Sequence, residues 1–117
     1  MAIRLVPEFF PEENVKYIVK FVEVCKQFGV TSFSVYDCEN NFEGLAKGHY
    51  RLLDMLDGLD DIVEVICRND DENLGTFYFN MGNEGMEIFH DYTDNGFCNQ
   101  VYKLVEKEIE PNVKCEH

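Results

Sequence analysis

Three short stretches of the sequence hold residue types that could carry out acid-base or nucleophilic chemistry: His90-Asp91, Asp37-Cys38-Glu39, and His49 near Arg51. A thiol becomes a nucleophile only where a base or a positive field favours its thiolate form. Cys38 or Cys98 with His90 as the base would be such a pair, and it would suit a small hydrolase or transferase. An enzyme of this class is therefore one hypothesis.

The surroundings of these residues argue against that chemistry. The chain around Cys38 and His90 is strongly acidic, and negative charge disfavours a thiolate. No motif marks a third group that would orient His90 as a base. We interpret His90 as a buried or half-buried histidine that is hydrogen-bonded to its neighbours, and we predict no catalytic residue.

Neither a metal ion nor a phosphate-bearing cofactor has a recognisable motif. An EF-hand loop needs oxygen ligands at alternate positions with glycine at the sixth, and residues 69–74 lack that order. Gly82 and Gly85 flank a segment that has no lysine and precedes no helix, so they indicate a hairpin turn. The 5 cysteines are widely spread without a Cys-x-x-Cys pair, which favours reduced thiols. We expect no metal and no cofactor.

The negative charge is concentrated in the middle of the chain. The formal net charge is -13, and residues 37 to 94 alone hold 15 acidic and 3 basic side chains. Direct binding to nucleic acid or to an anionic membrane needs lysine and arginine, so this balance disfavours both. A basic protein is the expected partner.

The densest acidic stretch contains eight carboxylates, with Arg68 as the only base among them. They are Asp54, Asp57, Asp60, Asp61, Glu64, Asp70, Asp71 and Glu72. If the first three lay on one side of a helix, their charges would be spaced like phosphates along a duplex, which favours DNA mimicry. The alternative is a solvated acidic face that keeps a small protein soluble.

The pattern of apolar residues predicts a single α+β domain over residues 1–117. We expect a helix from Pro11 to about Phe28, a strand from Thr31 to Cys38, a helix from Phe42 to Leu59, strands at 62–68, 74–81 and 86–92, and a final helix that Pro111 ends. The order α-β-α-β-β-β-α gives two layers, in which an antiparallel meander of three to five strands packs with about three helices. Residues 1–10 are an arm or an edge strand, and residues 112–117 are expected to fray.

Alternation along the meander assigns its side chains to two faces. Val63, Val65, Phe77, Phe79, Ile88 and His90 share the face that we assign to the helices. On the other face Ile66, Tyr78 and Phe89 form a small apolar centre among polar neighbours such as Glu64 and Glu87. An aromatic centre with a charged rim is typical of a protein-binding surface. The alternative is that a helix or the N-terminal arm covers it.

These observations favour a non-enzymatic, cytoplasmic binding protein that occludes a basic partner, such as a nucleic-acid-binding protein or nuclease. Tyr78 and Phe89 would anchor the partner, and the surrounding carboxylates would steer its approach. In size, acidity and element order the chain is similar, in a general way, to phage-encoded inhibitors and DNA mimics and to immunity proteins. A structural subunit that forms homodimers through the Ile66, Tyr78 and Phe89 face is a further alternative.

Overall fold

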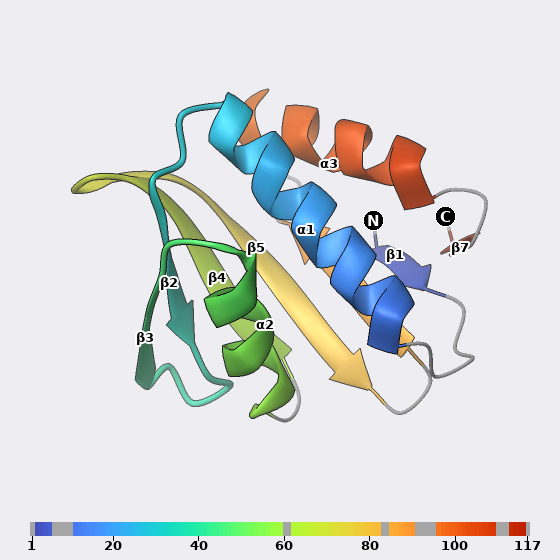
Figure 1. Cartoon of the computed structure of the whole chain (residues 1–117), viewed down its shortest axis with the longest axis horizontal. Coiled ribbons are helices and arrows are strands. Elements are labelled where there is room, and N and C mark those ends of the chain that lie inside the picture. Colours follow the sequence, from blue (N-terminus) through green and yellow to red (C-terminus); the bar gives the residue numbers. More distant parts are fainter. Residues whose placement is uncertain are drawn as a thin grey trace.

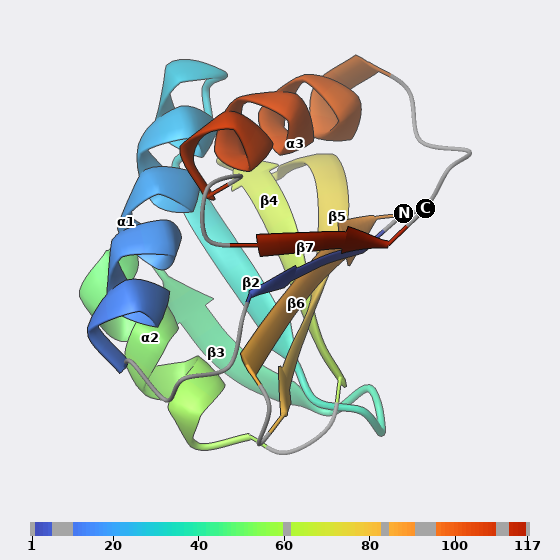
Figure 2. The same ribbon diagram turned by 90° about the vertical axis from the view of Figure 1, so that its right-hand side faces the viewer.

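Helices cover one face of a twisted antiparallel sheet (Figures 1 and 2). The structure, a computed structural model, describes residues 2–5, 11–59, 62–82, 85–90, 96–109 and 113–116. The described residues form the helices α1 (Pro11–Gln27), α2 (His49–Asp57) and α3 (Gly96–Ile109), and the strands β1 (Ala2–Leu5), β2 (Ser32–Tyr36), β3 (Phe42–Ala46), β4 (Ile62–Asn69), β5 (Glu72–Gly82), β6 (Gly85–His90) and β7 (Val113–Glu116). The strand order across the sheet is β3-β2-β4-β5-β6-β1-β7, with antiparallel pairing throughout.

Helix α1 forms where the sequence predicts it, because apolar residues recur at steps of three and four. Ile18, Phe21 and Cys25 are fully buried, while Lys16 and Lys26 on the opposite side are exposed. Gly29 follows the helix with a φ of 93°, a left-handed conformation that glycine adopts without strain. The helix therefore ends where the chain must turn back into β2.

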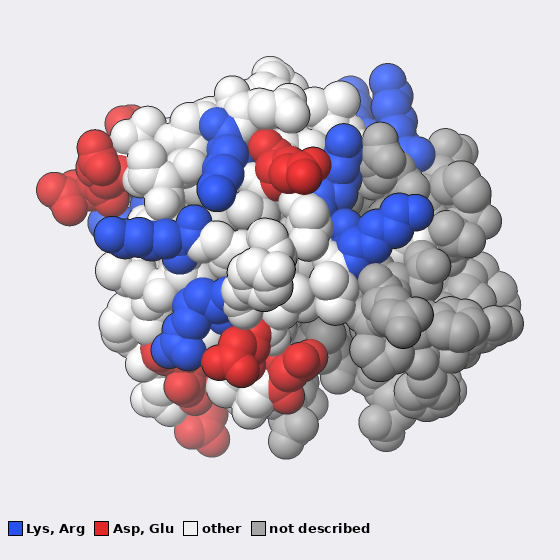
Figure 3. Space-filling view, viewed as in Figure 1, with Lys and Arg blue, Asp and Glu red and all other residues white. Residues whose placement is uncertain are grey.

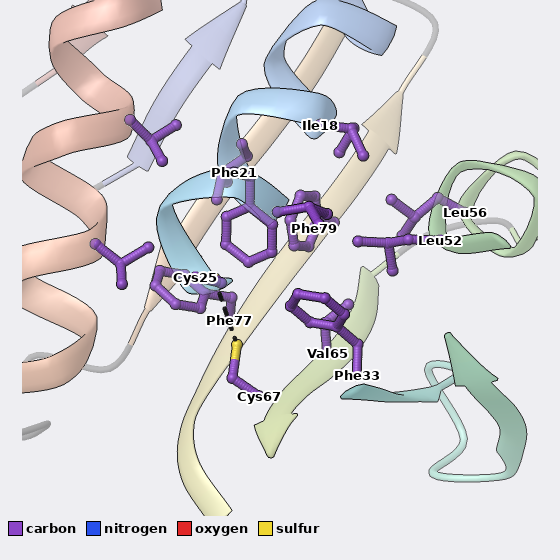
Figure 4. Close-up of a cluster of buried hydrophobic side chains, with 14 of the residues drawn as sticks. Ile18, Phe21, Cys25, Phe33, Leu52, Leu56, Val65, Cys67, Phe77 and Phe79 are labelled. Carbon is purple, nitrogen blue, oxygen red and sulfur yellow. Dashed lines mark hydrogen bonds between the residues drawn. The ribbon is translucent and has the colours of Figure 1, made fainter. Parts of the chain in front are cut away.

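The core lies between α1 and the centre of the sheet. Phe21 packs edge-on against Phe77 and Phe79, with ring centroids 5.0 and 5.1 Å apart, and it also contacts Phe33 (Figure 4). Such edge-to-face contacts add to the free energy gained by burying the rings themselves. Leu52 and Leu56 of α2 are fully buried and close the core beside β3. All these side chains come from elements that the sequence pattern marks as amphipathic.

The predicted α+β class, helix count and antiparallel meander are confirmed. Strands β4, β5 and β6 are consecutive neighbours joined by short turns, and β2 lies beside β4. The N-terminal segment, predicted as an arm or an edge strand, contributes β1, which lies inside the sheet between β6 and β7. The four predicted strands and the N-terminal segment are thus all part of the sheet, and two further strands, β3 and β7, extend it at its ends.

The prediction of a helix from Phe42 to Leu59 was wrong for its first part. Residues 42–46 form β3, a hairpin partner of β2, and α2 begins only at His49. Gly44 has a φ of 143°, far from helical values, and Asn40 takes a left-handed conformation in the hairpin turn. The leucine spacing that indicated a helix corresponds to one only after Gly48.

The prediction that residues 112–117 fray was also wrong for the part that the structure describes. Val113–Glu116 form β7, which pairs with β1 through four residue pairs, from Leu5 with Val113 to Ala2 with Glu116. Pro111 and Asn112, like residues 1, 6–10 and 117, lie outside the described residues. Two chain ends that are far apart in the sequence thus pair side by side (Figure 2).

Candidate protein-binding surface

The meander separates a buried face from an accessible one, as its alternation predicts. Val63, Val65 and Phe79 are fully buried against the helices. The residues between them are half-buried, among them Glu64, Ile66, Arg68, Thr76, Tyr78, Asn80, Glu87 and Phe89. We call the side of the sheet that bears these half-buried residues the open face, because no helix of the described chain lies on it (Figure 2).

Tyr78 and Phe89 lie together on the open face, as predicted. They are cross-strand partners on β5 and β6, and their rings stack with centroids 5.4 Å apart and an interplanar angle of 19°. Tyr78 pairs on its other side with Glu64 of β4. Ile66 pairs with Thr76, one step along the same face and diagonal to Tyr78. The predicted apolar centre is therefore one contiguous group.

A second aromatic pair continues this surface beyond Glu64. Tyr36 of β2 is the other cross-strand partner of Glu64, and Phe42 of β3 pairs with Tyr36, with ring centroids 5.4 Å apart. The residues Phe42, Tyr36, Glu64, Tyr78 and Phe89 thus form one row across five strands, which we call the aromatic row. At the usual spacing between strands it is about 19 Å long.

Sequence reasoning missed the outer half of this row. Phe42 was predicted to begin a helix, so it had no place on the sheet, and Tyr36 had no partner. A signal was present, because Asn40 and Asn41 are frequent in turns and lie between two aromatic residues that a short hairpin brings face to face. An interpretation of residues 37–41 as a hairpin loop would have placed Phe42 beside Tyr36 and so predicted the outer half of the aromatic row.

Asp37 fixes the hairpin that places Tyr36 beside Phe42. Its carboxylate accepts hydrogen bonds from the backbone N–H groups of Asn41 at 2.8 Å and Glu39 at 2.9 Å, and from the Asn41 side chain at 3.1 Å. The bond from the Asn41 backbone contributes most to a pKa of Asp37 that lies below its ordinary value. This carboxylate is therefore a structural element of the turn.

Glu64 is the only carboxylate within the aromatic row, and it lies between two tyrosines. Direct cross-strand neighbours have Cβ atoms about 5 Å apart, so both rings are within reach of a group that binds the carboxylate. A guanidinium at Glu64 could therefore pair with the carboxylate and also contact an aromatic face. This arrangement favours arginine over an uncharged ligand.

Among the described residues, the acidic side chains of α2 and those of the β4–β5 turn do not form one continuous patch. Asp54 and Asp57 are exposed on α2, where Asp54 pairs with Arg51 at 3.2 Å. Asp70 and Asp71 are exposed in the β4–β5 turn, at the opposite end of β4, about 26 Å away for a strand of 8 residues. Asp60 and Asp61 lie outside the described residues, and Asp60 is beyond the end of α2. The helical row that would mimic phosphates is thus not formed by these residues.

The excess of negative charge does not come from the two long helices, α1 and α3. Together α1 and α3 carry five lysines and five glutamates, so the remainder of the chain holds the whole formal charge of -13. A view of the helical face shows Lys and Arg side chains spread over it, together with several acidic ones (Figure 3). A basic partner is therefore attracted to the sheet and its turns more than to α1 and α3.

The histidine and the cysteines considered for catalysis are buried or lie apart in the sheet, and Asp91 lies outside the described residues. His90 is 8% exposed and packs edge-on against the rings of Phe77 and Tyr102. Cys98 is fully buried, and its thiol lies 3.6 Å from the backbone oxygen of Thr76. Cys38 is exposed in the β2–β3 turn, and β4 and β5 separate its hairpin from β6. Among the cysteines whose side chains are described, none is thus both exposed and close to His90 in the sheet.

Two further thiols belong to the core. Cys25 and Cys67 have sulfur atoms 4.0 Å apart, and both side chains are fully buried (Figure 4). Burial, and then the contact with Cys67, raise the pKa of Cys25 well above its ordinary value. Among the described residues no group of three or more histidine, cysteine, aspartate or glutamate side chains could hold a metal ion.

None of the helices in the described part of the chain is both long and apolar enough to cross a membrane. Comparison with protein-family models, with curated protein sequences and with solved structures found no match for this chain.

Proposed function

We propose that this protein is a non-enzymatic binding module whose open face occludes a basic, nucleic-acid-binding protein or nuclease. The observation that supports this proposal best is the aromatic row, in which Glu64 lies between Tyr36 and Tyr78. Tyrosine and phenylalanine are frequent anchors of protein interfaces, and a half-buried carboxylate among them selects a positive group. The partner would therefore present an arginine, or less favourably a lysine.

Arginine suits this surface better than lysine does. Its planar guanidinium can form two parallel hydrogen bonds to the Glu64 carboxylate and stack on a neighbouring tyrosine at the same time. A lysine ammonium forms point contacts and keeps more of its hydration. The stacked Tyr78 and Phe89 rings, with Ile66 beside them, would cover apolar surface of the partner around this arginine.

The carboxylates outside the aromatic row would act at longer range. Asp54 and Asp57 are exposed on α2, Asp70 and Asp71 are exposed in the β4–β5 turn, and Glu87 lies on the open face. Their field raises the rate of encounter with a basic surface, and salt screens it. A partner whose lysines and arginines bind these carboxylates cannot use the same groups to hold phosphate, so occlusion would block nucleic acid binding.

The free cysteines suit a reducing compartment, so we place this activity in the cytoplasm. Cys25 and Cys67 are close and buried, and both are thiols. An inhibitor of a nuclease or of a nucleic-acid-binding protein would also meet its target there.

Affinity capture with a pair of matched variants tests the proposal. The protein and the variants Tyr78→Ala and Tyr50→Ala are immobilised, and proteins of the source cell are retained at low salt and eluted at high salt. Tyr50 is 81% exposed on α2 and lies outside the aromatic row, so its variant controls for loss of a tyrosine ring. We expect that the unmodified protein and Tyr50→Ala both capture a basic protein. Tyr78→Ala should not capture it.

The captured protein then gives the functional readout. Its binding to nucleic acid, or its nuclease activity, should fall when the unmodified protein is added and should not fall with Tyr78→Ala. Capture that is equal for both variants would show that the open face is not the binding surface. Capture of acidic proteins alone would contradict the choice of partner.

A further inference from the structure

Strand β4 places an aliphatic side chain on each side of Glu64 along its own length. Val63 and Val65 are fully buried against the helices, so the residues that alternate with them lie on the open face. These are Ile62, which is 42% exposed, and the half-buried Glu64 and Ile66. At the usual rise of a strand, each isoleucine lies about 6.7 Å from Glu64. We call these three residues the β4 column.

The β4 column crosses the aromatic row at Glu64. Tyr36 and Tyr78 are the cross-strand partners of Glu64, and their strands are two strand spacings apart, about 9.6 Å. The cross-strand partners at the next step of the column are Ser34 and Thr76, which are smaller. A segment of a partner that followed the column would therefore pass between two tyrosines where it meets the carboxylate.

We propose that the partner presents an extended segment that lies along the β4 column, with an arginine over Glu64 and an apolar side chain two positions before it and two positions after it. This inference rests on the proposed function and specifies the chemistry of the segment that makes contact. Alternate side chains of an extended chain point to the same side and are about 6.7 Å apart, which matches the column. The recognised motif is apolar-x-Arg-x-apolar, and its apolar residues cover Ile62 and Ile66.

Two dimensions disfavour a helix in this place. One face of a helix repeats every 3.6 residues, or about 5.4 Å, so its side chains fall out of step with the column. A helix with its side chains is about 10–12 Å wide, which exceeds the distance of about 9.6 Å between the strands of Tyr36 and Tyr78. Neighbouring extended chains need only about 4.8 Å. An extended segment can thus reach Glu64 between the tyrosines, whereas a helix would rest on their rings.

Three labelled peptides test this inference by fluorescence anisotropy with the full chain. The alternating peptide has a central arginine with valine two positions before it and two after it, among serines and threonines. The adjacent peptide has the same composition, but its valines are next to the arginine and point away from the column when the chain is extended. A helix-forming, alanine-rich peptide carries the valines four positions from the arginine. We expect the alternating peptide to bind about tenfold more tightly than either of the others.

Variants of the protein locate the contact. Ile62→Ala should weaken binding of the alternating peptide by about fivefold and leave the adjacent peptide unaffected. Val15→Ala is the matched control, because Val15 is a β-branched residue on α1 with a similar exposure of 40%. It should change neither affinity. Glu64→Gln should weaken binding of every peptide that carries the arginine, and circular dichroism verifies that each variant folds.

The outcomes separate this inference from the proposed function on which it rests. Equal affinities for the alternating and adjacent peptides, tighter binding of the helical peptide, or no effect of Ile62→Ala would overturn the extended motif. So would an alternating peptide that does not bind at about 1 mM. In each of these cases a loss of arginine binding in Glu64→Gln would leave the proposed surface in place. Peptide affinities that Glu64→Gln leaves unchanged would contradict both the motif and the proposed surface.

Discussion

At the scale of single residues, Glu64 is the residue that we propose selects the partner of the open face. A half-buried carboxylate between Tyr36 and Tyr78 can replace its lost hydration with a guanidinium and two ring faces. The exposed carboxylates on α2 and in the β4–β5 turn lack aromatic cross-strand neighbours, so they attract charge without selecting its chemistry. Specificity and long-range attraction are thus carried by different residues.

We predict that Glu64→Gln weakens binding of an arginine-rich peptide by about tenfold, because a hydrogen bond to a charged group is lost. Asp57→Asn removes the same charge from an exposed position on α2 and should change the affinity much less. Isothermal titration calorimetry measures both. A lysine-rich peptide of equal length should lose less affinity than the arginine-rich one when Glu64 is replaced. Equal losses for the two variants would mean that only net charge matters.

Asp37 connects the stability of the β2–β3 hairpin to pH. Hydrogen bonds, first that from the Asn41 backbone, lower the pKa of this carboxyl, so the folded state favours its charged form. The stabilisation is fully present above the ordinary pKa of about 3.9 and is lost as the pH falls through the lower value of the folded state. Asp37→Ala should therefore destabilise the protein at pH 7, and the difference from the unmodified protein should shrink in acid.

Chemical denaturation at a series of pH values from about 7 to about 3 measures this difference. Glu39→Ala is the matched control, because Glu39 contributes its backbone N–H to the turn, which the variant retains. A difference for Asp37→Ala that stays constant down to the acid limit would show that the charge of Asp37 does not stabilise the turn.

At the scale of elements, close approach to β5 fixes the position of α3. A Cβ atom added at Gly75 would lie 2.6 Å from the sulfur of Cys98 and 2.8 Å from a ring carbon of Phe97, both in the first turn of α3. Only glycine leaves room for the helix at that distance. The end of α3 therefore rests directly on the backbone of the sheet.

We predict that Gly75→Ala lowers the free energy of unfolding by about 1–3 kcal/mol, the usual cost of overpacking. Gly48→Ala is the matched control, because a Cβ atom there would have no neighbour within 4 Å and the backbone is extended. Urea denaturation of both variants gives the comparison. If the two variants unfold alike, α3 does not depend on contact with Gly75.

The sequence predicts best those elements whose signals are local. The apolar steps of α1 and the strict alternation of β4 through β6 each repeat over many residues, so both the elements and their buried faces were predictable. Strand β3 carries a glycine in an unusual conformation and a β-bulge, which break the alternation that marks a strand. Strand β7 depends on pairing with β1, at the other end of the chain, and no local pattern reports such a contact.

The candidate site was likewise predictable where its contacts are local and not predictable where they depend on long-range pairing. Tyr78 and Phe89 lie on adjacent strands of one hairpin, so alternation alone brought them together. Phe42 and Tyr36 joined the aromatic row only because β2 pairs with β4 on one side and β3 on the other. The acidic residues lie near one another in the sequence, but β4 separates those of α2 from those of the β4–β5 turn, so the described ones do not form one patch.

At the scale of the whole molecule, the charge is unevenly distributed among the elements of the chain. The helices α1 and α3 are balanced, with five lysines and five glutamates, and the net charge of -13 belongs to the rest of the chain. A basic protein would thus be attracted less to α1 and α3 than to the other elements of the chain.

The most direct test of this account is residue-resolved nuclear magnetic resonance of the isotope-labelled protein during titration with a short arginine-rich peptide. We predict that the largest chemical-shift changes fall on Tyr36, Glu64, Tyr78 and Phe89, and that α1 and α3 change little. Changes that follow the exposed carboxylates of α2 and the β4–β5 turn, with the aromatic row unaffected, would contradict the central claim that the open face is the binding surface.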